Sequence, residues 1–578
     1  MSVLLGALLV AAIGVAFANR VRLVSRWLGL PVPSHAVRRE TTHVAMPDGA
    51  CLATDVYHPR TGEPQPTILI RTPYGRRGLI LMFGLVPRLF ASHGVHLVVQ
   101  DTRGRYGSEG EWDPFRHEAD DGCATLEWIG KQAWFDGRLA TWGASYFGLT
   151  QWAIAADPPV PIQAMVPIVT CASFHDIFWV GGAFSLSSAA RWASGVVGRR
   201  SRFPREGRLA RAFRSLPATT IDEATADAPV AFYREWIARP HAADPYWRAI
   251  DFASGIPRTD AAMLVVAGWW DIFVGPQIRD WQRLRREGRS EAARSARLVV
   301  GPWAHGRLAT RPFPPREASL IRKVAQESIV WFERWLRGGG AGDVAPVEVF
   351  TTGVNRWQSL DDFPPPSASE TPLFLRSRGR AATRSGDGYL CPEPPEAGEP
   401  PDSFAYDPLD PVPTCGGTFL GPKCGPADQR AVEDRSDVLC YTSRPLDDPL
   451  EATGFVRLAL FARTDAPATD FTAKLVDVRP DGFAMNLCEG ITRIISCPGP
   501  SGAQEIGIDL WAISHVFDRG HRIRLEVSSS NHPRFARHLN EVGPPEHGTT
   551  SSVAVQSVFH DATHPSRLVL PVVSRSSR

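Results

Sequence analysis

Residues 139–148 read Leu139-Ala140-Thr141-Trp142-Gly143-Ala144-Ser145-Tyr146-Phe147-Gly148. The first part of this stretch is apolar and strand-like, it stops at Gly143-Ala144-Ser145, and the residues that follow are helix-like. A sharp strand-to-helix turn lifts one serine hydroxyl above the edge of a sheet, and small neighbours keep the strained backbone free of clashes. The pattern predicts a nucleophile elbow at Ser145, and with it acyl-transfer chemistry.

Strand-like and helix-like segments alternate from about residue 41, as they do in an α/β domain. Short runs rich in Val, Ile and Leu are typical of buried parallel strands, and they occur at Thr67 to Arg71, His96 to Gln100, Leu139 to Trp142, Ala164 to Val169, Met263 to Ala267 and Leu298 to Val300. Between them, Glu118 to Lys131 predicts a helix with Cys123, Leu126 and Ile129 on one face.

Residues 171–257 interrupt this alternation. They are rich in aromatic residues and arginine, contain no clear strand, and fall between two strand candidates. We expect an inserted helical cap here, which divides the α/β core into residues 41–170 and 258–345. The arginines between Arg199 and Arg214 are interpreted as a solvated face of the cap, the alternative being a patch for an anionic ligand or a membrane.

The pattern changes after Gly338-Gly339-Gly340, which indicates a linker. Phe455 to Ala462 and Arg522 to Val527 alternate apolar with polar or small residues. This period of two, with turns rich in Pro and Gly, predicts an antiparallel β domain over residues 346–578, a sandwich or jelly roll. Ser377 to Thr414, dense in Pro and Gly, is expected to be a surface loop or an irregular edge.

Composition places the chain among globular proteins of more than one domain. Its 578 residues exceed one ordinary core, and its 43% hydrophobic and 21% charged residues exclude general disorder. A net charge of +2 argues against nucleic acid as the main partner. The 9 cysteines include no Cys-x-x-Cys pair typical of a metal site. Buried reduced thiols are expected, with a Cys415–Cys424 disulfide as the alternative.

The N-terminal residues 1–40 contain an uncharged apolar run from Val3 to Ala18. Arg20, Arg22 and Arg26 follow it, which favours an uncleaved membrane anchor. The run is short for a full span, and Ala16-Phe17-Ala18 resembles a signal cleavage site. Membrane association through residues 3–18, a cleaved signal and a packed helix therefore remain as interpretations. A membrane-associated or cytoplasmic protein is favoured, with a secreted protein as the alternative.

A serine hydroxyl needs a base to take its proton, usually a histidine oriented by a carboxylate. The strand candidate Met263 to Ala267 leads into Gly268-Trp269-Trp270-Asp271, and Leu298 to Val300 leads into a loop that contains His305. The order Ser145, Asp271, His305 is that of the α/β-hydrolases. Asp101 is another carboxylate after a strand, but it is expected to pair with Arg103 within a turn rather than to take part in catalysis.

Three blocks carry a more specific resemblance, namely Gly143-Ala144-Ser145-Tyr146-Phe147-Gly148, Gly268-Trp269-Trp270-Asp271-Ile272-Phe273-Val274-Gly275 and Gly301-Pro302-Trp303-Ala304-His305. They resemble the catalytic blocks of the bacterial cocaine esterase and X-Pro dipeptidyl-peptidase-like (CocE/NonD) hydrolases, and the similarity extends over residues 41–575. It accounts for Phe147 where a general esterase elbow has glycine, because this family places the glycine at 148. The resemblance implies an α/β-hydrolase core with an inserted helical cap and a C-terminal jelly roll.

An oxyanion intermediate needs hydrogen-bond donors. The elbow supplies the backbone N–H of Tyr146, and the resemblance implies the hydroxyl of Tyr74 as a second donor. A phenol is suited to this role because it stays protonated near neutral pH.

Aromatic residues next to the catalytic blocks predict an apolar or aromatic acyl group, with Trp179, Trp269 and Phe273 as substrate contacts. We expect a serine hydrolase that cleaves a small-molecule ester and needs no cofactor or metal. An X-Pro dipeptidyl-peptidase or another amide-cleaving acylase is the alternative, since Asp176 could pair with a substrate ammonium. A non-catalytic binding protein that uses its jelly roll is a further alternative, and the oligomeric state stays open.

Overall fold

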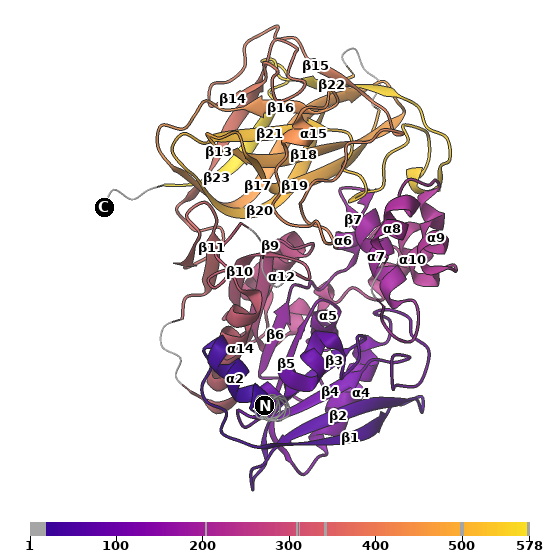
Figure 1. Ribbon diagram of the computed structural model, residues 1–578, viewed down its shortest axis with the longest axis vertical. Helices are drawn as coiled ribbons and strands as arrows, with labels where there is room; N and C mark the ends of the chain where they lie inside the picture. Colours follow the sequence, from indigo (N-terminus) through magenta and orange to yellow (C-terminus); the bar gives the residue numbers. More distant parts are fainter. Residues whose placement is uncertain are drawn as a thin grey trace, which may run out of the picture.

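The computed structural model describes residues 19–202, 205–307, 310, 312–339, 344–496 and 502–574. Figure 1 shows three parts: an α/β domain at the bottom, a β domain at the top, and a group of helices beside the junction of the two. Residues 3–18, on which the expectation of membrane association rests, lie outside the described residues. Within the described part of the chain, no helix combines the length and the apolar character needed to cross a bilayer.

The α/β domain is built on a ten-stranded sheet with the order β1-β2-β4-β3-β5-β6-β9-β10-β11-β12. The run from β4 to β11 is parallel, and the antiparallel strands β1, β2 and β12 lie at its edges. The strands are β1 Val37–Ala45, β2 Cys51–Pro59, β3 Gln65–Thr72, β4 His96–Asp101, β5 Phe135–Ala144, β6 Ala164–Ile168, β9 Ala262–Trp270, β10 Arg297–Ala304, β11 Val347–Thr351 and β12 Arg356–Leu360. The six strands expected from sequence are confirmed as β3, β4, β5, β6, β9 and β10.

Helices cover both faces of this sheet, which explains why its central strands are apolar on both sides. In β9, Met263 and Val265 pack into one core and Leu264 and Val266 into the other. The helices of the first face are α4 Glu118–Gly130, α12 Val274–Glu287 and the short α13 Glu291–Arg294, and those of the second are α3 Leu85–Ala91 and α14 Leu320–Arg337. Helix α5, Tyr146–Trp152, follows β5, and α2, Arg20–Leu28, packs against α3 and α14.

The sheet continues beyond residue 345, where the sequence analysis ends the core. Strand β11 pairs in parallel with β10, and β12 pairs with β11. The backbone of Thr352 then bonds to Ser514 and Val516 of the β domain. These strands therefore join the two domains through main-chain hydrogen bonds.

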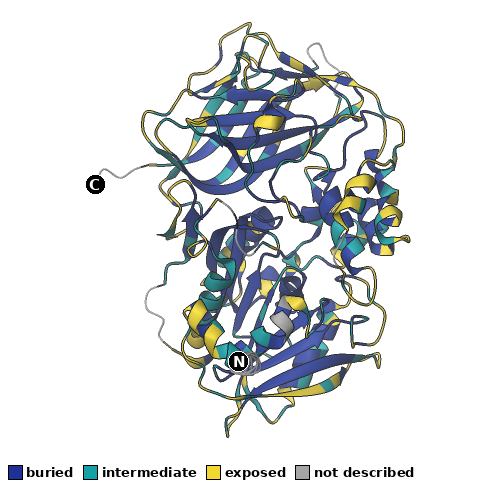
Figure 2. Ribbon diagram, in the orientation of Figure 1, coloured by how far each residue is buried: buried dark blue, intermediate teal, exposed yellow. Residues whose placement is uncertain are grey.

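The insertion between β6 and β9 is helical, as expected. It contains α6 His175–Phe178, α7 Leu186–Val196, α8 Glu206–Ala212, α9 Ile221–Ala226, α10 Ala231–Ile237 and α11 Pro245–Arg248, with a small hairpin of β7 Trp179–Val180 and β8 Ala183–Phe184. Its outer helices expose one face to solvent (Figure 2). Arg200, Arg205 and Arg211 are exposed there, as expected for a solvated face.

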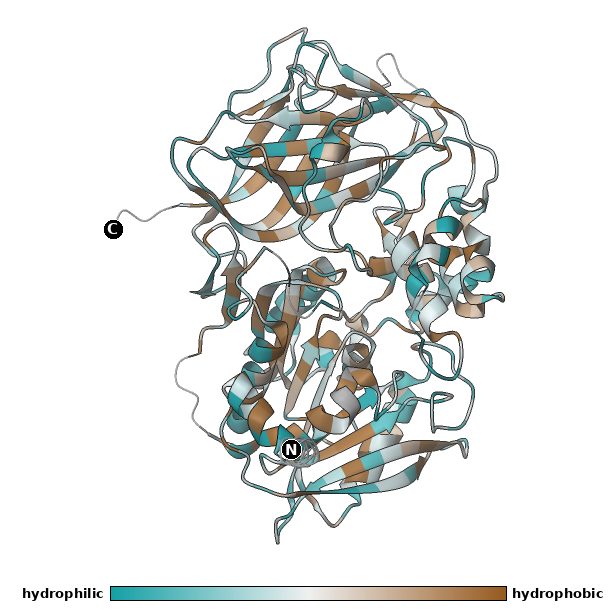
Figure 3. Ribbon diagram, viewed as in Figure 1, coloured by the Kyte–Doolittle hydropathy of each residue, from teal (hydrophilic) through white to brown (hydrophobic). Residues whose placement is uncertain are grey.

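The C-terminal part is a β domain around its own apolar core. One eleven-stranded sheet system includes β13 Ala368–Arg376, β14 Tyr389–Cys391, β15 Asp402–Tyr406, β16 Leu439–Thr442, β17 Leu450–Thr464, β18 Ala468–Val478, β19 Ala484–Ile495, β20 Gln504–Phe517, β21 Arg522–Ser528, β22 Ala554–Phe559 and β23 Arg567–Val573. A short helix, α15 Arg430–Glu433, precedes β16. Hydrophobic and hydrophilic residues alternate along its strands in Figure 3. Residues 377–414 are irregular except for β14 and β15.

The alternation of apolar and polar residues correctly predicts which side chains are buried in β17, but not all of those that are buried in β21. In β17, Val456, Leu458 and Leu460 are buried and Arg457 is exposed, as expected. In β21, Arg524 and Glu526 are buried as well, because Arg524 pairs with Glu433 of α15 and Glu526 with Lys474 of β18. The cysteines in the described part of the chain are free thiols, so the Cys415–Cys424 disulfide is not formed.

Burial of histidine makes the stability of the fold depend on pH. The pKa of His96 is lowered to about 4 by burial and by the neighbouring His58, and burial lowers the pKa of His532 and His538 to about 4 as well. Between about pH 6.5 and 4 the unfolded chain binds more protons than the folded one, so stability falls as the pH falls. Each of these three histidines should make the free energy of unfolding about 2 kcal/mol lower at pH 5 than at pH 7.5.

Urea unfolding at pH 7.5 and pH 5 measures this dependence. The drop in the urea midpoint should be smaller in His96→Gln than in wild type, and unchanged in the control His43→Gln, whose side chain is exposed. An equal drop in both variants would contradict the assignment to His96.

Candidate active site

Ser145 lies at the turn between β5 and α5 with φ 57° and ψ −126°. A positive φ is unusual for a residue other than glycine and stores backbone strain. Hydrogen bonds hold the turn in place: the Ser145 N–H donates to Ile168 O of β6 at 2.9 Å, and the Gln151 amide of α5 donates to Gly143 O and Val166 O. The predicted elbow is therefore present in its expected geometry.

Close packing explains the positions of the two glycines. A Cβ at Gly143 would lie 2.3 Å from Phe147 O, and one at Gly148 would lie 2.5 Å from Thr170 Cγ2. Position 147 has no such constraint, because the Phe147 ring packs into the core between the sheet and α14. The glycine occurs at 148 because that is where the segment after β6 crosses α5.

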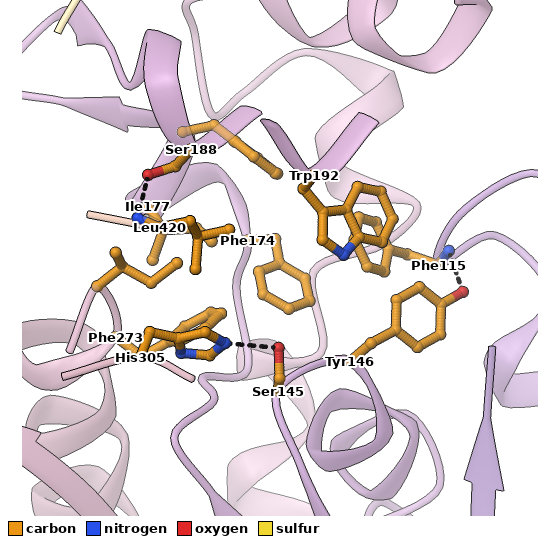
Figure 4. Close-up of a pocket in the computed structure, with 12 residues that line it drawn as sticks. Phe115, Ser145, Tyr146, Phe174, Ile177, Ser188, Trp192, Phe273, His305 and Leu420 are labelled. Atoms are coloured by element: carbon orange, nitrogen blue, oxygen red, sulfur yellow. Dashed lines mark hydrogen bonds between the residues drawn. The ribbon is translucent and has the colours of Figure 1, made fainter. Parts of the chain in front are cut away.

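The ends of β9 and β10 bring Asp271 and His305 to this serine. His305 Nε2 lies 3.1 Å from Ser145 Oγ, and His305 Nδ1 lies 2.9 Å from Asp271 Oδ2. Figure 4 shows the imidazole pointing at the serine hydroxyl. Asp271 is fully buried, and its other oxygen accepts a hydrogen bond from Phe273 N at 3.0 Å. This arrangement can transfer a proton from the serine to the histidine and orient the resulting imidazolium.

Two donors lie near Ser145. Tyr146 is the first residue of α5, a position whose backbone N–H has no acceptor within the helix. The Tyr74 hydroxyl accepts a hydrogen bond from Trp192 Nε1 at 2.9 Å. Burial raises the pKa of Tyr74, which hydrogen bonds with Trp192 and Ser145 oppose in part, so its phenol keeps its proton near neutral pH.

A buried polar network that sequence reasoning missed lies behind Tyr146. The Tyr146 hydroxyl donates to Glu118 Oε1 at 2.6 Å and accepts from Phe115 N at 3.0 Å. Glu118 pairs in turn with Arg71, N to O 3.0 Å, on β3. Burial raises the pKa of Glu118, against the effect of Arg71. The sequence predicted only that the apolar residues of α4 face the core. No local pattern indicated that Glu118 is buried.

A small cavity of about 30 Å³ opens beside Ser145. All three parts of the molecule contribute to it, and its lining consists of Phe115, Ser145, Tyr146, Phe174, Ile177, Phe178, Ser188, Trp192, Ile272, Phe273, His305 and Leu420. Leu420 comes from the β domain and is held there by its N–H, which donates to Ser188 Oγ of α7 at 3.1 Å (Figure 4).

The structure brings Phe273 into this cavity but not Trp179 or Trp269. Trp179 is buried in the cap, where its indole donates to Trp236 O at 2.9 Å. Trp269 is buried in the main core, where its indole donates to Phe350 O of β11 at 2.8 Å, so it faces away from the site. Trp192 and Leu420 line the pocket instead, and neither adjoins a catalytic block in the sequence.

The expected pairing of Asp101 with Arg103 is wrong. Asp101 at the end of β4 pairs with Arg76, which follows the parallel neighbour β3. Arg103 reaches Asp121 of α4 and Asp48. Among the described residues, no group of three or more His, Cys, Asp or Glu side chains is placed to hold a metal ion.

Comparison with known proteins places the chain in a family. The model for the X-Pro dipeptidyl-peptidase (S15 family) matches residues 48–307, and that for the X-Pro dipeptidyl-peptidase C-terminal non-catalytic domain matches residues 339–569. Cocaine esterase of Rhodococcus sp. (strain MB1 Bresler) is 35% identical over 570 residues, which covers 92% of this chain and 98% of that protein.

Solved structures agree on the fold. An aminopeptidase from the marine sediment archaeon Thaumarchaeota archaeon has a TM-score of 0.79 at 24% identity, covering 93% of this chain and 97% of that one. An α-amino acid ester hydrolase has a TM-score of 0.79 at 23% identity, covering 94% and 98%. The chain therefore belongs to the cocaine esterase and X-Pro dipeptidyl-peptidase-like (CocE/NonD) family of serine hydrolases, with an α/β-hydrolase core, an inserted helical cap and a C-terminal jelly roll.

Proposed function

We propose that this protein is a serine esterase that transfers an apolar acyl group from a small-molecule ester to water through Ser145. The observation that carries the proposal is the continuous hydrogen-bond chain Ser145–His305–Asp271, which opens onto an apolar cavity. The likeness to cocaine esterase over nearly the whole chain supports ester cleavage.

In the proposed mechanism His305 Nε2 accepts the Ser145 proton as the hydroxyl oxygen attacks the ester carbonyl. Asp271 accepts the hydrogen bond from Nδ1–H, which selects the correct tautomer and stabilises the imidazolium. The proton then passes to the leaving alcohol, and a water molecule activated by the same histidine hydrolyses the acyl-enzyme. The Tyr146 N–H and the Tyr74 O–H would stabilise the oxyanion in both steps.

The cavity favours a neutral acyl group. None of its lining side chains among the described residues carries a carboxylate, and an unpaired ammonium is costly to bury. Asp176, considered from sequence as a partner for such a charge, is 56% exposed at its side chain, whereas its neighbour Ile177 lines the cavity. A volume of about 30 Å³ holds about two water molecules, so large acyl groups require Trp192, Leu420 or their neighbours to shift.

Replacing the nucleophile tests the enzymatic assignment. Ser145→Ala should lower kcat for p-nitrophenyl acetate by about 10⁴-fold or more, because the histidine loses the group that it activates. Labelling by a fluorophosphonate should disappear as well. Ser194→Ala, a cap serine bonded to Arg191 O, is the matched control and should keep both. A wild-type protein that shows neither turnover nor labelling would refute the proposal.

Removing one phenol tests the oxyanion role. Tyr74→Phe should lower kcat by about 10²-fold or more with little change in KM, since the hydroxyl acts mainly in the transition state. Steady-state kinetics on p-nitrophenyl acetate give both constants. Turnover close to wild type would remove Tyr74 from the mechanism.

A pair of substrates separates the esterase from the peptidase. Phenyl acetate should be hydrolysed with a higher kcat/KM than Ala-Pro p-nitroanilide, because the cavity offers the peptide's ammonium no carboxylate. Faster cleavage of the anilide would favour the X-Pro dipeptidyl-peptidase activity that the family model names.

A further inference from the structure

A hydrogen bond from the cap reaches the proposed oxyanion site. Trp192 of α7 donates its indole N–H to the Tyr74 hydroxyl oxygen at 2.9 Å. An indole can only donate, and a phenol carries one proton. The Tyr74 proton is therefore available to another acceptor, and the Tyr74 ring lies edge-on to that of Phe147, two residues after Ser145, at a centroid distance of 6.2 Å.

Aromatic stacking fixes the orientation of the Trp192 indole. Its plane lies 12° from that of Tyr146 at a centroid distance of 6.0 Å, and 17° from that of Phe115 at 5.8 Å. Phe232 packs against it edge-on at 5.8 Å. Stacked rings of this kind hold one rotamer, so the N–H is held in the direction of Tyr74.

A buried arginine joins the two segments that carry this pair. Arg105 Nε donates to Pro73 O, next to Tyr74, at 3.0 Å, and its Nη1 donates to Val196 O, at the end of α7, at 2.7 Å. Arg105 also stacks over the Trp112 ring at 4.2 Å. The turn that carries Tyr74 and the helix that carries Trp192 are thus tied to the same guanidinium.

We propose that Trp192 is a positioning residue for acyl transfer, whose indole N–H holds the Tyr74 hydroxyl with its proton directed at the oxyanion. The two bonds form a chain from the Trp192 N–H through the Tyr74 O–H to the oxyanion, and each bond in such a chain strengthens the next. The inference rests on the proposed function and on the oxyanion role of Tyr74. It assigns the cap a part in transition-state stabilisation besides forming a wall of the pocket.

A double-mutant cycle with Trp192→Phe and Tyr74→Phe tests the coupling. The substrate is p-nitrophenyl acetate, whose acetyl group is too small for its binding to depend on contact with the more distant side chains that line the cavity. We expect Trp192→Phe to lower kcat about tenfold, as befits one orienting hydrogen bond, with KM unchanged. The double variant should be no slower than Tyr74→Phe alone, because without the phenol the indole N–H has nothing to orient.

The matched control is Trp281→Phe. Trp281 of α12 donates its indole N–H to Ala296 O at 3.0 Å and does not line the cavity. This variant removes an equivalent bond and should leave kcat unchanged. Fluorophosphonate titration of active sites normalises every rate to correctly folded enzyme.

Inhibition by methylboronic acid, whose methyl group matches the acetyl group of the substrate, provides a second readout. Its tetrahedral adduct with Ser145 places an oxygen at the oxyanion position, so Trp192→Phe should weaken its binding by about the same factor as kcat. A rise in KM with kcat intact would overturn the proposal. A fall in kcat of the double variant equal to the product of the two single falls would overturn it as well, because the two residues would then act independently. If wild type hydrolyses the ester and either of these results is found, the positioning role of Trp192 fails while the esterase assignment stands.

Discussion

The site depends on a backbone turn that leaves no room for a side chain at either glycine beside Ser145. Gly143 lies against the carbonyl of Phe147, and Gly148 against Thr170. With both contacts closed, β5, α5 and the segment after β6 take one relative position, and Ser145 keeps its positive φ. The strain of that residue is sustained because the surrounding strands over-determine the turn.

Three parts of the molecule meet at this serine. The core supplies the nucleophile turn and the loops that follow β9 and β10, the cap supplies Trp192 on α7, and the β domain supplies Leu420. Main-chain bonds around Thr352 and the bond from Leu420 N to Ser188 Oγ hold the β domain against the other two. The family model that matches the β domain describes a non-catalytic domain, yet the β domain completes the wall of the cavity through Leu420.

Features that follow from strand order could be predicted from sequence. Parallel strands end at one edge of a sheet, so Ser145, Asp271 and His305 could be brought together from apolar runs and the residues after them. The glycine at 148, one position later than in a general esterase elbow, also indicated the family. These inferences need only the backbone path, which local patterns encode.

Features that depend on where a side chain points could not be predicted in this way. Trp269 lies within a catalytic block, yet its side chain packs into the core. Trp192 instead reaches the site from helix α7, 47 positions beyond Ser145 in the chain. Asp101 pairs with Arg76 rather than Arg103 because β3 and β4 are neighbours. Arg524 and Glu526 are buried because charges of other elements cover them. The pairings of Asp101, Arg524 and Glu526 are tertiary contacts that no local window of sequence contains.

Two buried carboxylates lie behind side chains that line the cavity, and their partners explain how the cavity can be apolar. Asp271 bonds to His305 and to Phe273 N, and Glu118 bonds to Tyr146 and Arg71. Because these bonds lie within the wall, neither carboxylate faces the cavity, where it would favour a cation. A neutral acyl group then needs only apolar contact and the donors at the oxyanion. The partners of Asp271 and Glu118 therefore leave the cavity lining without a carboxylate, which agrees with the neutral ester that we propose as substrate.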